Sequence, residues 1–304
     1  MNKWIIYALL APALYALVVF IDKYVVSKHV KDYRCMPIYA GIMGFVGGTL
    51  IWLLTGRPLL NPFDTFIALT TGFLTTIAFV AYYKALSKEE PSKINIFFQL
   101  SPVFVLLLSW LILGEKITLQ QLIGFALIVV AALSVSVERN KKTKNKFFIS
   151  KGLLYIVFYN ILFAVSAVLI KLTLNFNTLA TILSYPSWGA GLGALVLYIF
   201  SSGIRTSFHE SISSINKKAL LIMLSNEAIF IFARAITYLA YSLGLVALVS
   251  ALEGAQVFYG IGYGWIVTII APGIILEDIS KKNIITKLLA AIILVFGIWL
   301  ISAV

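Results

Sequence analysis

Apolar residues in this chain come in long runs, not in the short alternating stretches of strands or the one-sided stripes of surface helices. Ten of these runs are close to the length, about 20 residues, at which a helix crosses the hydrocarbon core of a bilayer. Backbone polar groups inside a bilayer must bond within the protein, so runs of this kind form helices. The predicted crossings are residues 4–26, 35–54, 64–86, 93–113, 119–137, 152–174, 179–200, 218–243, 245–272 and 284–302.

Composition agrees with a chain that lies mostly in lipid. Hydrophobic residues make up 61% of it and charged residues only 12%, whereas about 25% of a soluble domain is charged. The first run is too long for a signal peptide and lacks a small-residue cleavage pattern after it, so we expect a retained helix. We predict an all-α, multi-pass integral membrane protein in contact with membrane lipid, in the cytoplasmic membrane of a bacterium or archaeon.

The formal net charge of +12 is explained by the loops. With ten crossings, eighteen lysines and arginines fall on one side of the membrane and three on the other. Basic loops stay in the cytoplasm, which places the central run "ERNKKTKNKFF" inside and both termini outside. Since the loops account for the charge in this way, we predict no nucleic-acid partner.

The basic run divides the chain into two halves that resemble each other. "YALVVFIDKYVV" aligns with "FAVSAVLIKLTL", which places Lys23 opposite Lys171, and "SPVF" aligns with "AQVF". We predict one repeat over residues 1–138, a basic linker over 139–151 and a second repeat over 152–304. Because five crossings is an odd number, the two copies insert with opposite orientation. Inverted repeats are typical of secondary transporters, whose substrate site lies near the midplane between the halves.

One stretch of the first half carries a family resemblance. Residues 85–133 contain Pro102 in "LSPVF", the helix-ending "LGE" at 113–115 and Gly124 in the closing helix. This stretch resembles the end of an EamA domain of the drug/metabolite transporter superfamily. The resemblance implies a ten-helix transporter, and export is the direction that it favours.

The second half departs from that pattern. Gln256 stands where Pro102 would be, and Leu276 replaces the glycine of "LGE". The span between these motifs is longer than in the first half. We therefore expect the ninth helix to be longer, or interrupted around Pro272 and Gly273. The family resemblance also implies termini inside the cell, whereas the loop charges of this chain predict the reverse.

Glycines spaced four residues apart occur in three predicted helices. The pairs are Gly44 with Gly48, Gly189 with Gly193, and Gly260 with Gly264. Small residues at this spacing let two helix backbones approach closely in lipid. We expect close helix contacts at these pairs.

Besides the basic residues counted with the loops and Asp64 at the start of a helix, six charged residues fall inside the predicted helices. A charge at the bilayer centre costs about 3 kcal/mol on insertion scales, so such residues face the protein interior. Three acids and three bases suggest mutual compensation within one polar interior. Two of the bases lie near helix ends, where they either snorkel toward headgroups or line the interior. The six are Asp22, Lys23, Lys171, Glu227, Arg234 and Glu253.

Glu227 and Arg234 form the sharpest candidate for a binding site. They are seven residues apart on one helix face, about 10 Å along the axis, which suits a small zwitterion. Arg234 would take a carboxylate or phosphate group, and Glu227 or Glu253 an ammonium group or a coupling proton. An Arg234–Glu253 ion pair between helices is the structural alternative. The other candidate substrate-binding residues are Gln256, Tyr241, Tyr238, Asn95, Gln99, Trp188, Lys23 and Lys171.

An enzyme is disfavoured by the residues present. His29 and His209 fall in predicted loops, so no helix carries a histidine pair for zinc, and no glycine-rich phosphate loop is present. A single cysteine, Cys35, excludes an internal disulfide and cysteine-based metal clusters. We predict no catalytic residues, cofactor or metal.

The function predicted from the sequence is secondary transport. We expect a small polar or zwitterionic metabolite such as an amino acid to cross by alternating access, with protons as the candidate coupling ion. The protein is expected to be a monomer or a homodimer. Two alternatives stay open: a flippase for a lipid-linked head group, and a membrane scaffold that transports nothing.

Overall fold

The computed structural model describes residues 3–89, 91, 94, 97–136, 151–174, 177–270 and 281–302. Within these ranges the chain is helical and contains no strand. The first half comprises α1 (Lys3–Lys28), η1 (Tyr33–Cys35), α2 (Met36–Leu54), α3 (Pro62–Leu86), η2 (Phe98–Leu100), α5 (Ser101–Leu108), the π turn η3 (Ser109–Leu113) and α6 (Leu119–Ser136). The second half comprises α7 (Lys151–Leu174), α8 (Leu179–Phe200), α9 (Ser202–Ser214), α10 (Lys217–Leu243), α11 (Val246–Leu252), η4 (Glu253–Ala255), α12 (Gln256–Ile270) and α13 (Lys281–Ser302).

Several helix boundaries follow from capping residues in the sequence. Asn61 begins α3 by accepting from the amide of Asp64, and Asn216 begins α10 by accepting from that of Ala219, both at 2.8 Å. A side-chain acceptor at this position satisfies one of the free amides of the first turn. Gly114, the glycine of "LGE", ends the π turn with φ 65°, a left-handed conformation that glycine adopts most easily.

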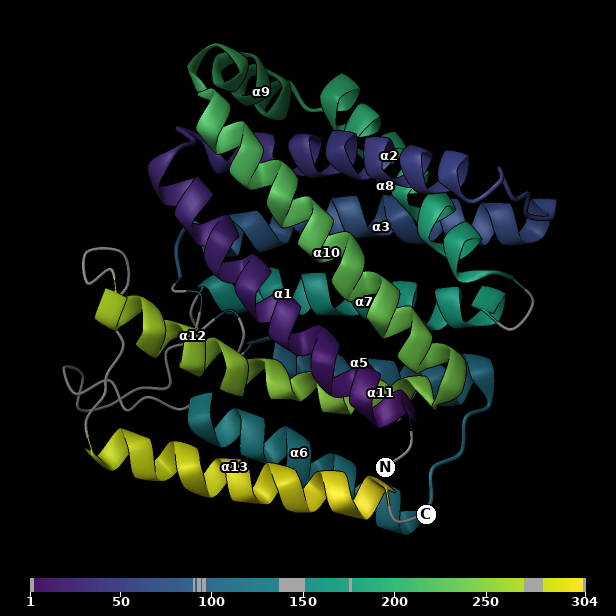
Figure 1. Ribbon diagram of the computed structural model, residues 1–304, viewed down its shortest axis with the longest axis vertical. Helices are drawn as coiled ribbons and strands as arrows, with labels where there is room; N and C mark the ends of the chain where they lie inside the picture. The colour runs from purple at the N-terminus through teal and green to yellow at the C-terminus, as the bar shows by residue number, and fades with distance from the viewer. Residues whose placement is uncertain are drawn as a thin grey trace.

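The helices pack in pairs that join the two halves of the chain. Figure 1 shows α1 and α10 running side by side diagonally across the front, and α6 beside α13 at the lower edge. Helix α2 packs on α8, and α3 packs on both α7 and α8. The start of α1 and the end of α13 both lie in the lower right part of this view (Figure 1). Each half is therefore packed largely against the other.

The contact of α3 with α8 depends on glycines. A Cβ atom at Gly72 would lie 1.7 Å from the carbonyl oxygen of Pro186, and one at Gly189 would lie 2.0 Å from that of Leu69. On α2, a Cβ at Gly48 would lie 2.4 Å from that of Ser187. The close contacts predicted at Gly48 and Gly189 are thus confirmed. We call this α2–α3–α8 contact the glycine seam.

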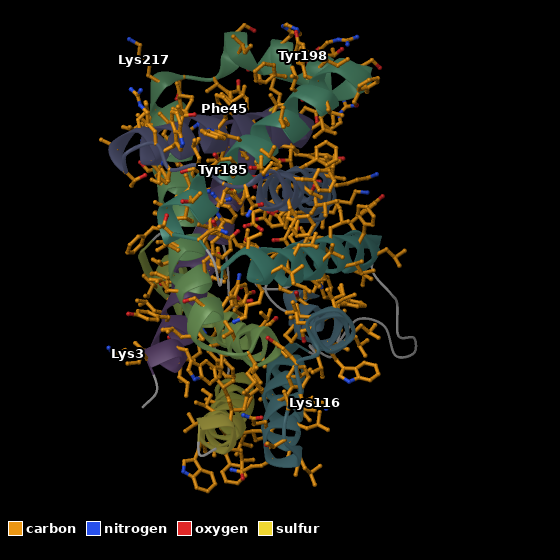
Figure 2. The ribbon with its side chains drawn as sticks, turned by 90° about the vertical axis from the view of Figure 1, so that its right-hand side faces the viewer. Lys3, Phe45, Lys116, Tyr185, Tyr198 and Lys217 are labelled. Atoms are coloured by element: carbon orange, nitrogen blue, oxygen red, sulfur yellow. The ribbon has the colours of Figure 1, made fainter. Side chains whose placement is uncertain are left out.

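The outer surface of the described helices is apolar. Phe45, Leu111 and Ile292 are 48%, 67% and 66% exposed, and Figure 2 shows Phe45 among the side chains of the upper half. Extensive exposed apolar surface marks a face that contacts something other than water. Six described helices are long and apolar enough to span a membrane: α1, the η1–α2 segment, α3, the 154–174 part of α7, α8 and α10.

One described helix was not expected. The sequence predicted a loop at His209, but this residue lies in α9, where its Nε2 is 2.9 Å from the hydroxyl of Tyr198. Only Ile204, Ser207 and Ser211 of α9 are buried. The helix is too short and too polar for the hydropathy pattern of a crossing, which explains why that pattern did not reveal it. It lies at the upper end of the molecule (Figure 1), the end at which Figure 2 labels Tyr198 and Lys217.

Candidate functional site

A cavity lies between the two halves of the chain. It holds about 830 Å³ of atom-free space, its open mouth included. Helices α1, α3 and α5 line it from the first half, and α7, α10, α11 and α12 line it from the second. The polar residues on its wall, apart from the tyrosines, are Asp22, Ser101, Asn160, Asn226, Glu227, Ser250, Glu253 and Gln256.

The cavity lies where two helical segments are interrupted. A 3-10 turn, η2, precedes α5, and a second 3-10 turn, η4, separates α11 from α12. Phe98 in η2 and Glu253 in η4 both line the cavity, as do Pro102 and Gln256 just after the turns. Interrupted helices at membrane depth occur where the backbone lines a cavity or a binding site. The interruption predicted around Pro272 and Gly273 lies outside the described residues.

Asp22 on α1 is the most heavily bonded side chain of the cavity. Its carboxylate accepts from the hydroxyls of Tyr82 (2.8 Å) and Tyr83 (3.2 Å) and from Nδ2 of Asn226 (2.9 Å). Asp22 itself is only 4% exposed. The sequence placed Asp22 among the six charges expected to face the interior but did not select it as a site residue, because its partners lie on α3 and α10.

Three predicted site residues meet on the cavity wall from two helical segments. Glu227 comes from α10, Glu253 from η4, and Gln256 from the start of α12. Oε1 of Glu253 is buried and has no hydrogen-bond partner among the described residues. The cavity therefore contains three carboxyl groups, Asp22 included.

Aromatic side chains form much of the remaining wall. Tyr159 lies 5.0 Å from Phe98 and 5.8 Å from both Tyr82 and Phe163, measured between ring centroids. Tyr15, Phe79 and Phe230 continue the lining on the other side. The sequence analysis did not select these aromatic residues as site residues. Tyr15 and Phe163 each lie eight residues before one of the two aligned lysines, Lys23 and Lys171, and this was the signal that could have identified them.

Arg234 lies beside the cavity and is absent from its lining. It is 8% exposed, its Nη2 donates to Oγ of Ser187 at 2.5 Å, and its guanidinium carbon is 5.6 Å from the centroid of Phe230. It forms no ion pair with Glu253, the structural alternative raised by the sequence. Tyr238 and Tyr241 are buried on the same helix with their rings stacked, and they too are absent from the cavity lining.

The two repeat-matched lysines hold helix ends together. Nζ of Lys23 donates to the carbonyl of Leu86 (2.7 Å) and to a second carbonyl just beyond the end of α3. Nζ of Lys171 donates to the carbonyls of Tyr241 and Gly244 (3.1 Å) at the end of α10. Cations are favourable at helix C-termini, where carbonyls lack partners. Neither lysine is among the residues that line the cavity.

Glu115, the acid of "LGE", holds the next turn of the chain. Its carboxylate accepts from the amides of Val246 (2.9 Å) and Ala247 (3.3 Å), which begin α11. A carboxylate at a helix N-terminus satisfies free amides and complements the helix dipole. Lys171 and Glu115 thus hold the α10–α11 turn from its two sides.

The remaining candidates lie elsewhere. The indole of Trp188 donates to the hydroxyl of Thr49 (2.9 Å) and packs on Trp52 and Tyr185, outside the cavity lining. Asn95 lies outside the described residues, as does the side chain of Gln99. Asn160 and Asn226, by contrast, are cavity residues that the sequence did not select as site residues.

Apolar outer faces, interrupted helices and an internal polar cavity define a membrane protein built like a transporter. The family model of the EamA-like transporter family matches residues 2–137. An uncharacterized transporter of Sinorhizobium sp, from the cobO 3′ region, is 30% identical over 141 residues, which is 45% of this chain and 98% of that protein. The chain belongs to the EamA-like transporter family, as its sequence motifs predicted.

Two further comparisons agree with this membership. An uncharacterized transporter of Clostridium kluyveri is 23% identical over 150 residues, 46% of each chain. A solved crystal structure has a TM-score of 0.66 and 15% identity, covering 99% of this chain and 96% of its own, so the two share a fold. The family and the names of these relatives indicate an integral membrane transporter rather than an enzyme.

Proposed function

We propose that this chain is a secondary transporter that moves a small polar or zwitterionic metabolite, such as an amino acid, by alternating access. Export is the direction proposed, and protons are the proposed coupling ion. The observation that carries the proposal is a polar cavity lined from both halves at two interrupted helical segments. Sites of this kind lie between the repeats of transporters, where rocking of one half against the other exposes them to each side in turn.

The helix packing supports two inverted repeats of five crossings each, over residues 1–138 and 152–304 with a linker over 139–151. In this arrangement α1 corresponds to α7, α2 to α8, α3 to α10 and α6 to α13. Exchanging the halves then converts the α3–α7 contact into the α10–α1 contact. The same exchange maps the α2–α8 and α6–α13 pairs onto themselves. Lys23 at the end of α3 then corresponds to Lys171 at the end of α10. The proposed orientation keeps the basic linker in the cytoplasm and both termini outside.

Cysteine accessibility tests alternating access without knowledge of the substrate. Ser250 lines the cavity and Ser184 on α8 does not, and both are fully buried. Each is changed to cysteine in a Cys35→Ser background and treated with a membrane-impermeant maleimide in right-side-out and in inside-out vesicles. We expect Ser250→Cys to react in both preparations and Ser184→Cys in neither.

The other outcomes separate the alternatives. Reaction of Ser250→Cys from one side only would contradict alternating access, and reaction from neither side would favour a scaffold. Reaction from both sides, together with thermal stabilisation by lipid head groups alone, would favour a flippase. For the coupling ion, the test is transport by the Glu227→Gln variant. Transport with an unaltered pH dependence would show that Glu227 has no role in proton coupling.

A further inference from the structure

We propose that the cavity selects an organic cation, namely an ammonium group attached to a small aromatic or apolar body. This inference rests on the proposed transport function, for which the cation would be the substrate. It goes beyond a zwitterion site, because no recognition of a negative group by the cavity wall is required. Four features of the wall carry it.

The charged groups of the wall are all acidic. Asp22, Glu227 and Glu253 line the cavity, and among the described residues no lysine, arginine or histidine does. The nearby Arg234 donates through Nη2 to Ser187 and lies against Phe230, whereas its Nε has no partner among the described residues. Lys23 and Lys171 bind backbone carbonyls at helix ends. When these carboxyl groups are ionised, such a wall in a medium of low dielectric constant attracts a cation and repels an anion.

Two amide side chains of the wall, those of Asn226 and Asn160, each have a buried acceptor without a partner among the described residues. Nδ2 of Asn226 donates to Asp22 (2.9 Å) and Nδ2 of Asn160 donates to the carbonyl of Phe97 (2.8 Å). These partners can only accept, so they fix which end of each amide is the donor. Oδ1 of both asparagines is then left buried without a partner among the described residues, as is Oε1 of Glu253.

Two serines of the wall are also unpartnered. Ser250 is fully buried and Ser101 is 7% exposed, and neither Oγ has a hydrogen-bond partner among the described residues. Leaving a buried polar group unsatisfied costs about 1–3 kcal/mol. In native proteins such groups find their partner in ordered water, an ion or a ligand. Since the amide and carboxyl groups need donors, an ammonium group with its N–H donors fits them.

The aromatic wall suits the remainder of such a ligand. Phe98, Tyr159 and Phe163 form a continuous cluster, and Phe79, Tyr15 and Phe230 face the same cavity. Aromatic faces attract cations, most strongly where water is excluded. The same rings provide apolar contact for an aromatic or alkyl body.

The test uses ligand sets that differ only in charge. The purified full chain is heated with alkylamines and phenylalkylamines of graded size, each matched by the alcohol and the carboxylate of the same skeleton. A ligand that binds only the folded state raises the melting temperature by mass action. We expect at least one amine to raise it, with the matched alcohol and carboxylate having no effect at the same concentration.

Charge-removing variants locate the binding. Glu253→Gln and Glu227→Gln each keep side-chain size, and we expect each to weaken amine affinity by about tenfold or more. Glu210→Gln on α9 removes an exposed carboxylate far from the lining and should leave the affinity unchanged. If one cavity variant fails to fold, the other still supplies the measurement.

The remaining outcomes overturn the inference. Equal or greater stabilisation by carboxylates or alcohols, stabilisation by Na⁺ or K⁺ alone to the same extent, or no effect of any amine would each contradict an organic-cation site. A failure of the transport proposal is detected by a different measurement, the cysteine accessibility. If the cysteine reacts from both sides but no amine binds, the organic-cation inference is wrong and the transport proposal stands. If an amine binds but the cysteine reacts from one side only, the cation site stands and alternating access is wrong.

Discussion

The glycine seam and the cavity wall differ in how their buried polar groups are hydrogen-bonded. In the seam, backbones are in contact and buried hydroxyls are bonded: Oγ of Ser184 donates to the carbonyl of Ala180 and that of Ser187 to the carbonyl of Leu183, both at 2.8 Å. In the cavity wall, the hydroxyls of Ser101 and Ser250 and the amide oxygens of two asparagines have no partner among the described residues. The seam therefore supplies stability, and the cavity gives up stability to keep groups available for a ligand.

The largest expected effect is on the seam. Gly72→Ala places a methyl group into the backbone of α8, so it should lower stability by at least the about 1–3 kcal/mol usual for overpacking. The measurement is the midpoint of thermal unfolding in detergent. Gly262→Ala is the matched control, because nothing lies within 4 Å of its added Cβ. Equal midpoints for the two variants would contradict the seam.

Next in size is loss of a lysine at a helix end. Lys171→Met leaves two carbonyls at the end of α10 without their donor, and each lost partner of a charged group costs about 1–3 kcal/mol. Lys23→Met should behave alike at the end of α3. The thermal midpoint checks both, with exposed Lys116→Met as the control. If either variant keeps full stability but loses amine binding, that lysine belongs to the site instead.

The smallest change in stability is expected for a serine of the cavity wall. This prediction compares the wall with the glycine seam most directly. Ser250→Ala removes an unpartnered hydroxyl, so stability should stay the same or rise by up to about 1 kcal/mol. Ser184→Ala removes a bonded one and should cost about 1 kcal/mol. Both serines are fully buried, which makes the pair a matched comparison by thermal unfolding. A larger loss for Ser250→Ala would show that its hydroxyl is bonded after all.

Local sequence patterns gave the helices and part of the site. Apolar runs predicted where α3 and α10 begin and end to within a few residues. Glu227, Glu253 and Gln256 were identified because polar residues inside apolar helices face the interior. Asp22 was overlooked, because its partners Tyr82, Tyr83 and Asn226 are 60 to 204 residues away along the chain.

The sequence by itself determined that this chain is a helical membrane protein of a transporter family, because hydropathy, capping and short motifs are properties of neighbouring residues. Only the tertiary structure decided which charges meet. It brought the three acids to one cavity, held Arg234 beside Ser187 and placed both lysines at helix ends. These positions depend on how helices from the two halves cross. Helix crossing is set by packing between segments distant in sequence, so a local sequence pattern does not predict it.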